Sequence, residues 1–344
     1  VQVERVDPLA ERDWDERIGE MPGAGFFHGA AWARVLHGAY GFTPVYLAVK
    51  SMGRVRALLP LMEVDSWLTG RRGIALPFTD QCDPVGPDGD LIRRLLEAAV
   101  DHARVRGWKY LEIRGGRSLF ENAVSSTSFW GHRLDLCADD AALLARVESS
   151  VRRAVRKAEK SDVTVECSQD LESVRAFYRL LCVTRKRHGV PPQPWNFFAN
   201  IHRHILATGL GRVILAHHRG GPVAGAVFFH SGKTAIYKFG ASDETQQHLR
   251  ANNLVMWEGI KRYGREGLTV LDFGRTSLGN EGLRRFKLSW GTAEHRLDYT
   301  KFDLKRGAFV TAKDESAGWH NHVFRNMPVF LSRAVGRLLY RHIA

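Results

Sequence analysis

The sequence lacks any apolar run that approaches the ~20 residues a membrane-spanning helix needs. Its first twenty residues mix acidic and basic side chains without an apolar stretch, so we expect no signal peptide. Cysteine is scarce, and the four cysteines are scattered without a CxxC pair: Cys82, Cys137, Cys167 and Cys182. This spacing indicates neither a zinc site nor a disulfide framework. We therefore expect a cytoplasmic protein, with the inner face of the membrane as the alternative location.

Several catalytic motifs are also missing. The sequence contains no GxSxG, HExxH, P-loop or EF-hand pattern, which argues against the corresponding hydrolases, metalloproteases, nucleotide-binding proteins and calcium-binding proteins. Histidine is abundant, at 15 residues, but pairs such as His202/His204 and His217/His218 lack metal spacing on a common helical face. We expect neither a metal site nor a tightly bound cofactor.

Acidic residues are outnumbered by basic ones, with 37 Asp and Glu against 50 Lys and Arg, so the formal net charge is +13. Such a balance favours a polyanionic partner: a tRNA, a nucleotide-linked substrate or an anionic membrane face. Hydrophobic residues make up 44% of the 344 residues, which is ordinary globular composition. The length is comfortable for two domains, each with its own core.

The chain contains a weak internal repeat. Two hairpins are expected, one from Val45–Lys50 and Val55–Val64, the other from Val213–His217 and Val223–His230. Each is followed by an amphipathic helix, a single glycine and an apolar strand; Gly107 aligns with Gly267, and Glu112 with Asp272. The matching order predicts a duplication.

Two basic amphipathic helices stand apart from this repeat. Within residues 143–166, Val151, Val155 and Ala158 share one side, and five cations form a dense ridge: Arg152, Arg153, Arg156, Lys157 and Lys160. The ridge either meets an anion or is a solvated basic face. The tail, residues 321–344, carries an apolar stripe of Phe324, Met327, Leu331, Val335 and Leu338. It either docks on its own domain, which we favour, or lies on an anionic membrane.

The segment DFGRTSLGNEGLRRFKLSWG, residues 272–291, predicts a strand, a turn and a short helix, Leu283–Ser289. Its glycines do not form GxGxxG, so no nucleotide fingerprint is present. It resembles the signature of the Fem-type (FemAB/FemX-like) peptidoglycan aminoacyltransferases and the BioF2-like acetyltransferases of the GNAT superfamily. SSVRRAVRKAEKSDVTVE, from Ser149, is similar to the start of that family's second domain. TRKRHGVPPQP, from Thr184, resembles the branch found with exopolysaccharide and exosortase gene clusters.

The resemblance covers about residues 25 to 305 and implies an α/β (α+β) fold of two tandem GNAT-like domains. Each would be a mixed, largely antiparallel sheet flanked by helices. The expected division is an N-terminal domain, 1–140; a basic connecting helix, 141–165; a C-terminal domain, 166–310; and a C-terminal amphipathic helix, 311–344.

The resemblance further implies an N-acyltransferase that moves an acyl or aminoacyl group to an amine of a cell-envelope precursor or saccharide. A GNAT domain binds CoA pyrophosphate through [QR]xxGx[GA]. Here Gln247–Asn252 carries side chains at both glycine positions, which hinders close backbone approach. The donor therefore stays open between aminoacyl-tRNA and acyl-CoA, and the expected acceptor is a nucleotide- or lipid-linked glycan.

Lys287 is the predicted catalytic residue implied by the family, as a stabiliser of the tetrahedral oxyanion. Asp80 and Asp83, in a loop after a strand, are the predicted acids. The remaining predicted substrate-binding residues are Arg275, Arg284, Arg285, Tyr237, Lys238, Arg152 and Arg156. The alternative from another class is a non-catalytic GNAT-like protein that binds nucleic acid through the basic helix at residues 152–160.

Overall fold

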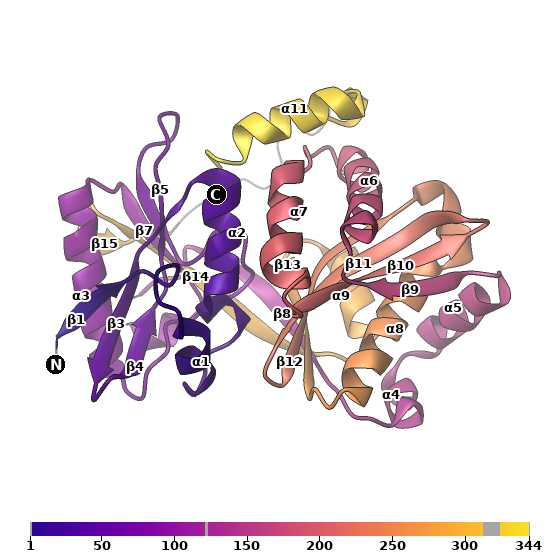
Figure 1. The fold of residues 1–344 in the computed structure, drawn as a ribbon, viewed down its shortest axis with the longest axis horizontal. Coiled ribbons are helices and arrows are strands. Elements are labelled where there is room, and N and C mark those ends of the chain that lie inside the picture. The colour runs from indigo at the N-terminus through magenta and orange to yellow at the C-terminus, as the bar shows by residue number, and fades with distance from the viewer. Residues whose placement is uncertain (1, 121–122, 312–323, 344) are drawn as a thin grey trace. The chain divides into compact units, whose positions relative to one another are not determined.

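The computed structural model describes residues 2–120, 123–311 and 324–343. Contacts divide the chain into two compact units (Figure 1). Unit 1 combines Val1–Phe129, Arg296–Ser316 and Leu338–Ala344, and unit 2 combines Trp130–His295 with Ala317–Arg337. Among the described residues, the chain passes between the units inside two strands, β8 (Thr127–Asp135) and β14 (Ala293–Asp303), and inside the last helix, α11 (Val329–Leu339). Each unit is therefore assembled from segments that lie far apart in the sequence.

Unit 1 contains strands in two groups. β1 (Val3–Val6), β3 (Tyr46–Ser51) and β4 (Arg54–Leu59) are antiparallel. The second group has the order β2 (Thr43–Pro44), β5 (Met62–Val64), β6 (Arg72–Ile74), β7 (Tyr110–Arg114) and β14, with β15 (Ala308–Phe309) paired to β14. The expected first hairpin forms as β3 and β4. Its second strand ends at Leu59, before Pro60, because proline has no N–H for the ladder.

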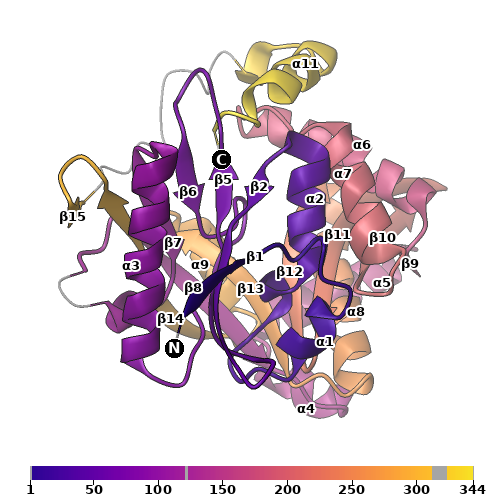
Figure 2. The same cartoon turned by 60° about the vertical axis from the view of Figure 1, so that its left-hand side comes forward.

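Helices cover both faces of the strands of unit 1. α2 (Ala30–Tyr40) and α3 (Gly89–Arg106) lie on opposite sides (Figure 2), and the short α1 (Trp14–Gly19) precedes them. α3 buries Leu95, Ala99 and Ala103 in a core with residues from β3, β4 and β7. It ends at Gly107, whose φ of 65° is the left-handed conformation that glycine favours, and β7 follows.

Unit 2 is built on one sheet. The order is β8, β13 (Val270–Ser277), β12 (Thr234–Ser242), β11 (Gly221–Ser231), β10 (Gly211–His218) and β9 (Thr164–Ser168). β9 to β12 are antiparallel, and β12 and β13 are parallel. β10 and β11 confirm the second expected hairpin. The fold is thus mixed α/β with a largely antiparallel sheet, as expected.

Helices also cover both faces of this sheet. α6 (Leu171–Arg187) and α7 (Trp195–Ile201) pack on one face; α5 (Ser149–Lys160) and α8 (Ala251–Arg265) belong to the core of the other, beside the short α4 (Asp140–Arg146). On α5, Val151, Val155 and Ala158 are buried, which confirms the predicted apolar side. α8 leads through Gly267 (φ 80°) into β13, just as α3 leads through Gly107 into β7. The same order of elements therefore occurs in both halves.

The C-terminal helix, α11 (Val329–Leu339), begins just after Pro328. Its buried residues are Ser332 and Gly336, and a Cβ on Gly336 would collide with the carbonyl oxygen of Pro192. Arg333 stacks on the ring of Tyr178 at 5.5 Å. The helix therefore docks through small residues. The predicted apolar stripe does not make this contact, because Leu331 and Leu338 are exposed. Residues 321–323 and 344 of the predicted tail lie outside the described residues.

Candidate active site

The most unusual feature of unit 2 is the separation of two parallel strands. β12 and β13 pair only over their first residues, Thr234–Ile236 with Val270–Asp272, although both strands continue for several residues. β12 also bulges at Lys238, since Phe228 pairs with Tyr237 while Val227 pairs with Phe239. Strands that diverge in this way present backbone N–H and C=O groups that require other partners. The arrangement can accept an extended ligand that carries amide groups.

Lys287 contacts β13 just beyond the point where this strand separates from β12. It belongs to α9 (Glu281–Leu288), whose first turn is capped by Asn280 Oδ1, which accepts a 3.1 Å hydrogen bond from Leu283 N. The Lys287 side chain is buried, and Nζ donates to the carbonyl oxygens of Gly274 and Arg275 at 2.9 Å each. Gly274 has a φ of 69°, which breaks the strand's alternation and lets successive carbonyls point to one ammonium group. Lys287 thus ties α9 to the end of β13.

His132, on β8, is the residue near Lys287 that sequence reasoning missed. It has no solvent exposure, and neither ring nitrogen has a hydrogen-bond partner among the described residues. Burial, followed by the charge of Lys287, lowers the pKa of His132 to about 4, while Glu294 opposes the shift. The alternation of residues along β8 could have predicted that His132 is buried. Trp130, His132 and Leu134 fall on one face of the strand, and Leu134 is in the core.

The predicted arginines of this segment have different surroundings. Arg284 donates to both carboxylate oxygens of Glu294, at 2.7 and 2.9 Å, and stacks 4.7 Å over the ring of Trp130. This pairing raises the pKa of Arg284 and lowers that of Glu294. Arg285 is exposed, and Arg275 is half-buried on β13. Arg284 therefore helps hold α9 to β14, whereas Arg285 is open to solvent.

Tyr237 and Lys238 occupy the bulged part of β12. Tyr237 packs against Phe228 and Phe273, with ring centroids 5.5 and 6.2 Å away, and burial raises its pKa to about 12. Lys238 is the extra residue of the bulge and is half-buried. Tyr237 accordingly forms part of the wall beneath the diverging strands.

Asp80 and Asp83 belong to unit 1, whereas Lys287 belongs to unit 2. The main-chain oxygen of Asp80 accepts a hydrogen bond from Tyr299 Oη at 2.5 Å. Asp83 accepts one from Gln81 Nε2 at 2.6 Å and lines a hollow of about 440 Å³. The hollow is polar, and its other lining residues are Gln81, Gly115, Gly116, Arg117, Ser118, Phe120, Ala123, Arg296, Leu297 and Asp298.

Arg152 and Arg156 line a second hollow, of about 550 Å³, between α4 and α5 in unit 2. Arg153 and Ser149 also line it, and its apolar part comes from Ala141, Leu144 and Ala145. No carboxylate is among these lining residues. The structure therefore brings the predicted basic residues of α5 together in a groove suited to an anion.

The Gln247–Asn252 segment leads into α8. Arg250 adopts a φ of 60° directly before the helix, in the left-handed region where a glycine is expected. The backbone conformation at this position is thus compatible with glycine, but a long cationic side chain occupies it.

Across the described ranges there is no cluster of His, Cys, Asp or Glu fit for a metal ion, and no helix is long and apolar enough to span a bilayer.

Comparison with known proteins agrees with this geometry. Residues 145–288 match the family model of the acetyltransferase (GNAT) domain. That segment contains the diverging strands and Lys287, so this part of unit 2 is similar to a GNAT domain. No match to the sequence was found among curated proteins.

Solved structures share the fold over most of the chain. FemX is 17% identical, with a TM-score of 0.68 over 87% of this chain and 97% of its own. A tandem GNAT protein from the clavulanic acid biosynthesis pathway is 12% identical, with a TM-score of 0.56 over 88% and 98%. L-PGS from Bacillus licheniformis is 11% identical, with a TM-score of 0.55 over 97% and 99%. The predicted resemblance to Fem-type GNAT proteins is confirmed at the level of the fold, which a tandem GNAT protein shares.

Proposed function

We propose that the protein is an N-acyltransferase that moves an acyl or aminoacyl group to an amine of a cell-envelope precursor or saccharide. The supporting observation is the separation of β12 from β13, with Lys287 fixed behind it, inside the segment that matches the GNAT domain. The nature of the acceptor rests on similarity to FemX and to L-PGS, at the level of fold.

The reaction has one bond to form and one to break. The amine nitrogen of the acceptor attacks the carbonyl carbon of the donor ester or thioester, and the carbonyl oxygen becomes an oxyanion. The carbon–oxygen or carbon–sulfur bond then breaks, and the nitrogen loses a proton while the leaving group or solvent gains one. A buried ammonium such as that of Lys287 stabilises negative charge on the oxyanion more strongly than one in water.

The neighbouring groups suit supporting tasks. His132 has a pKa of about 4, so its imidazole is neutral at pH 7. So low a pKa suits a hydrogen-bond acceptor that orients an amine better than a general base. Asp83 and Asp80 stay proposed acids, and Arg275, Arg285, Tyr237 and Lys238 stay proposed contacts for the substrates.

Two donors fit the chemistry. Acyl-CoA is the usual donor of GNAT domains, and aminoacyl-tRNA is the donor implied by the Fem-type resemblance. The side chain of Arg250 at the start of α8 disfavours close approach of a pyrophosphate to the backbone. The groove with Arg152, Arg153 and Arg156 suits the phosphates of either donor.

The test is transfer to amine acceptors from acyl-CoA and from charged tRNA, with Lys287→Met beside the wild type. We expect kcat/KM to fall at least about a hundredfold, because removal of an oxyanion stabiliser typically has that effect. Lys305→Met, at an exposed position of unit 1, is the control and should keep full activity. A folded Lys287→Met protein with wild-type activity would refute this role of Lys287. Sensitivity of the transfer to RNase would identify tRNA as the donor.

The alternative is a non-catalytic nucleic-acid-binding protein, favoured by the arginine groove on α5. In that case RNA binding falls in the double variant Arg152→Ala, Arg156→Ala, and no donor gives any transfer.

A further inference from the structure

Exposed apolar side chains gather in two short segments. Among the described residues, Trp67 and Leu68, at the turn between β5 and β6, are 85% and 53% exposed. Near the C-terminus, Leu338 is 69% and Ile343 is 51% exposed. Scattered single apolar residues are normal on a protein surface, but a group of large ones marks an interaction site.

The C-terminal segment is attached to this turn, and all the groups involved belong to unit 1. His342 Nδ1 lies 2.9 Å from Ser66 Oγ, and the His342 ring meets that of Trp67 at a centroid distance of 5.4 Å. The His342 carbonyl accepts hydrogen bonds from Thr69 Oγ1 and Arg72, at 2.9 and 2.7 Å. These contacts hold the end of the chain at His342 against the turn. The exposed residues of the two segments, Trp67, Leu68, Leu338 and Ile343, are here called the apolar tip.

Charge near the apolar tip is positive. Residues 324–343 contain four arginines and no acidic residue: Arg325, Arg333, Arg337 and Arg341. Arg337 and Arg341 are exposed and flank Leu338 in the sequence. The carboxylate beside the turn, Asp65, is paired with Arg71 at 2.6 Å. A large apolar surface flanked by unopposed arginines is complementary to an anionic lipid surface.

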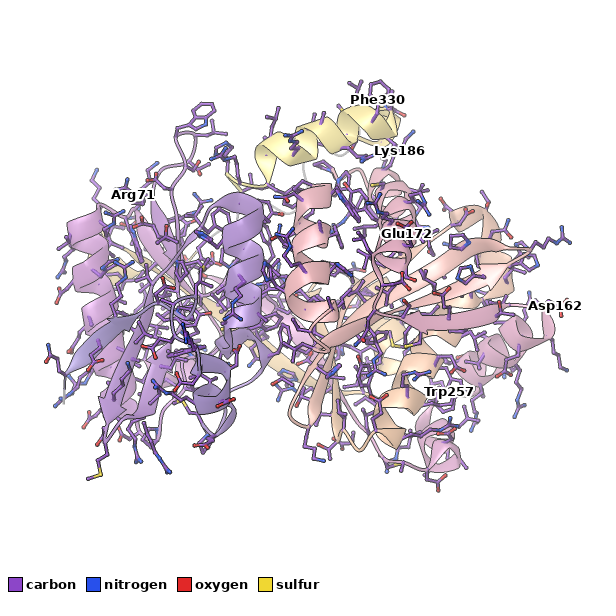
Figure 3. All side chains as sticks on the ribbon, in the orientation of Figure 1. Arg71, Asp162, Glu172, Lys186, Trp257 and Phe330 are labelled. Carbon is purple, nitrogen blue, oxygen red and sulfur yellow. The ribbon has the colours of Figure 1, made fainter. Side chains whose placement is uncertain are left out.

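In unit 2, α11 carries exposed apolar residues of its own. Phe330 is 68% exposed and Leu331 44%, while the helix docks through Ser332 and Gly336. Figure 3 shows Phe330 on the outer side of the α11 ribbon. Since small residues make the contact with the body, the larger apolar residues remain available to another partner.

We propose that the apolar tip binds the surface of an anionic bilayer, so that the protein is a peripheral membrane protein. Trp67 would lie at the level of the lipid headgroups, where an indole ring places its apolar body and polar N–H favourably. The arginines would contact lipid phosphates. Exposed tryptophan, leucine and isoleucine side chains distinguish this surface from the arginine groove of α5 and favour a bilayer over RNA, whose backbone offers them no partner.

The experiment is co-sedimentation of the full chain with vesicles of phosphatidylcholine alone or mixed with phosphatidylglycerol. We expect binding to the anionic vesicles that weakens as salt is added. The double variant Trp67→Ser, Leu68→Ser should lower the partition coefficient at least about tenfold, because two large side chains lose their insertion. Arg337→Gln with Arg341→Gln should lower binding and its dependence on salt.

The control is Met52→Ser with Val105→Ser, which removes apolar side chains that are 100% and 86% exposed elsewhere in unit 1. It should bind as the wild type does. Absence of binding to anionic vesicles, or an equal loss in tip and control variants, would overturn the proposal. So would RNA binding that depends on Trp67 without vesicle binding. Transfer between soluble substrates should be unchanged in the tip variant, so the result is independent of the proposed acyltransferase activity.

Discussion

At the scale of single residues, the buried polar groups of unit 2 carry the argument. Lys287 is a buried cation whose ammonium group is held by two backbone carbonyls. His132 is a buried imidazole without a hydrogen-bond partner in the described structure. Burial of a polar group costs free energy unless a partner offsets it. Because His132 is buried without such a partner, we infer that its task lies in binding or chemistry.

His132 makes stability depend on pH. An ordinary histidine has a pKa near 6.5, whereas burial and Lys287 lower that of His132 to about 4. Between these values the unfolded chain binds a proton that the folded chain does not, so this contribution is complete above pH 6.5 and is lost as the pH falls toward 4. The free energy of unfolding should fall by about 2 kcal/mol more between pH 7 and pH 5 in the wild type than in His132→Gln.

Urea denaturation at the two pH values measures this difference. The matched control is a second histidine variant, His218→Gln, at the end of β10. The charged and titratable groups that face His132 are Lys287, Glu294, His295 and Arg284. An identical pH dependence in His132→Gln and the wild type would show that His132 does not titrate as described.

At the scale of elements, the decisive feature is how β13 ends. The strand leaves β12 after Asp272, takes a left-handed residue at Gly274, and continues into a turn that α9 closes. Gly274 permits the left-handed conformation inside the strand, and Lys287 donates hydrogen bonds to the carbonyls of Gly274 and Arg275. Gly274 and Lys287 therefore stabilise the end of β13 together.

Replacement of Gly274 tests this stabilisation. In Gly274→Ala, a Cβ would disfavour the φ of 69°, so we expect a loss of about 1–2 kcal/mol in the free energy of unfolding. Displaced carbonyls would also move Lys287, so transfer activity should fall. Gly279→Ala is the control, because a Cβ there meets no atom within 4 Å and no left-handed φ is required. Equal stability of the two variants would contradict this account.

At the scale of the whole molecule, two hydrophobic cores lie each within one unit. The core around α5 and α8 draws all of its members from residues 134–290, and the core around α3 has none there. A domain with a complete core can fold alone. We therefore propose a division at the unit boundaries inside β8 and β14, in place of boundaries near 140 and 310.

A fragment of residues 130–295 tests that division. It retains every member of the core of unit 2, so we expect a single cooperative unfolding transition in urea. A fragment of residues 141–310 lacks Leu134 and Leu136 and should be less stable by a few kcal/mol, since each buried leucine contributes about 2 kcal/mol or more. A non-cooperative transition in the fragment of residues 130–295 would mean that unit 2 depends on unit 1.

The sequence by itself determined the regular elements and the type of fold. Apolar periodicity and glycine positions located the hairpins, α5 and the helix–glycine–strand units, because these depend on local spacing. The motif around Lys287 indicated the GNAT domain. The tertiary structure alone decided what depends on contacts distant in sequence: the divergence of β12 and β13, the burial of His132 beside Lys287, and the docking of α11 through Ser332 and Gly336. Helical periodicity shows that an apolar stripe exists, but only packing decides whether it faces the core or the solvent.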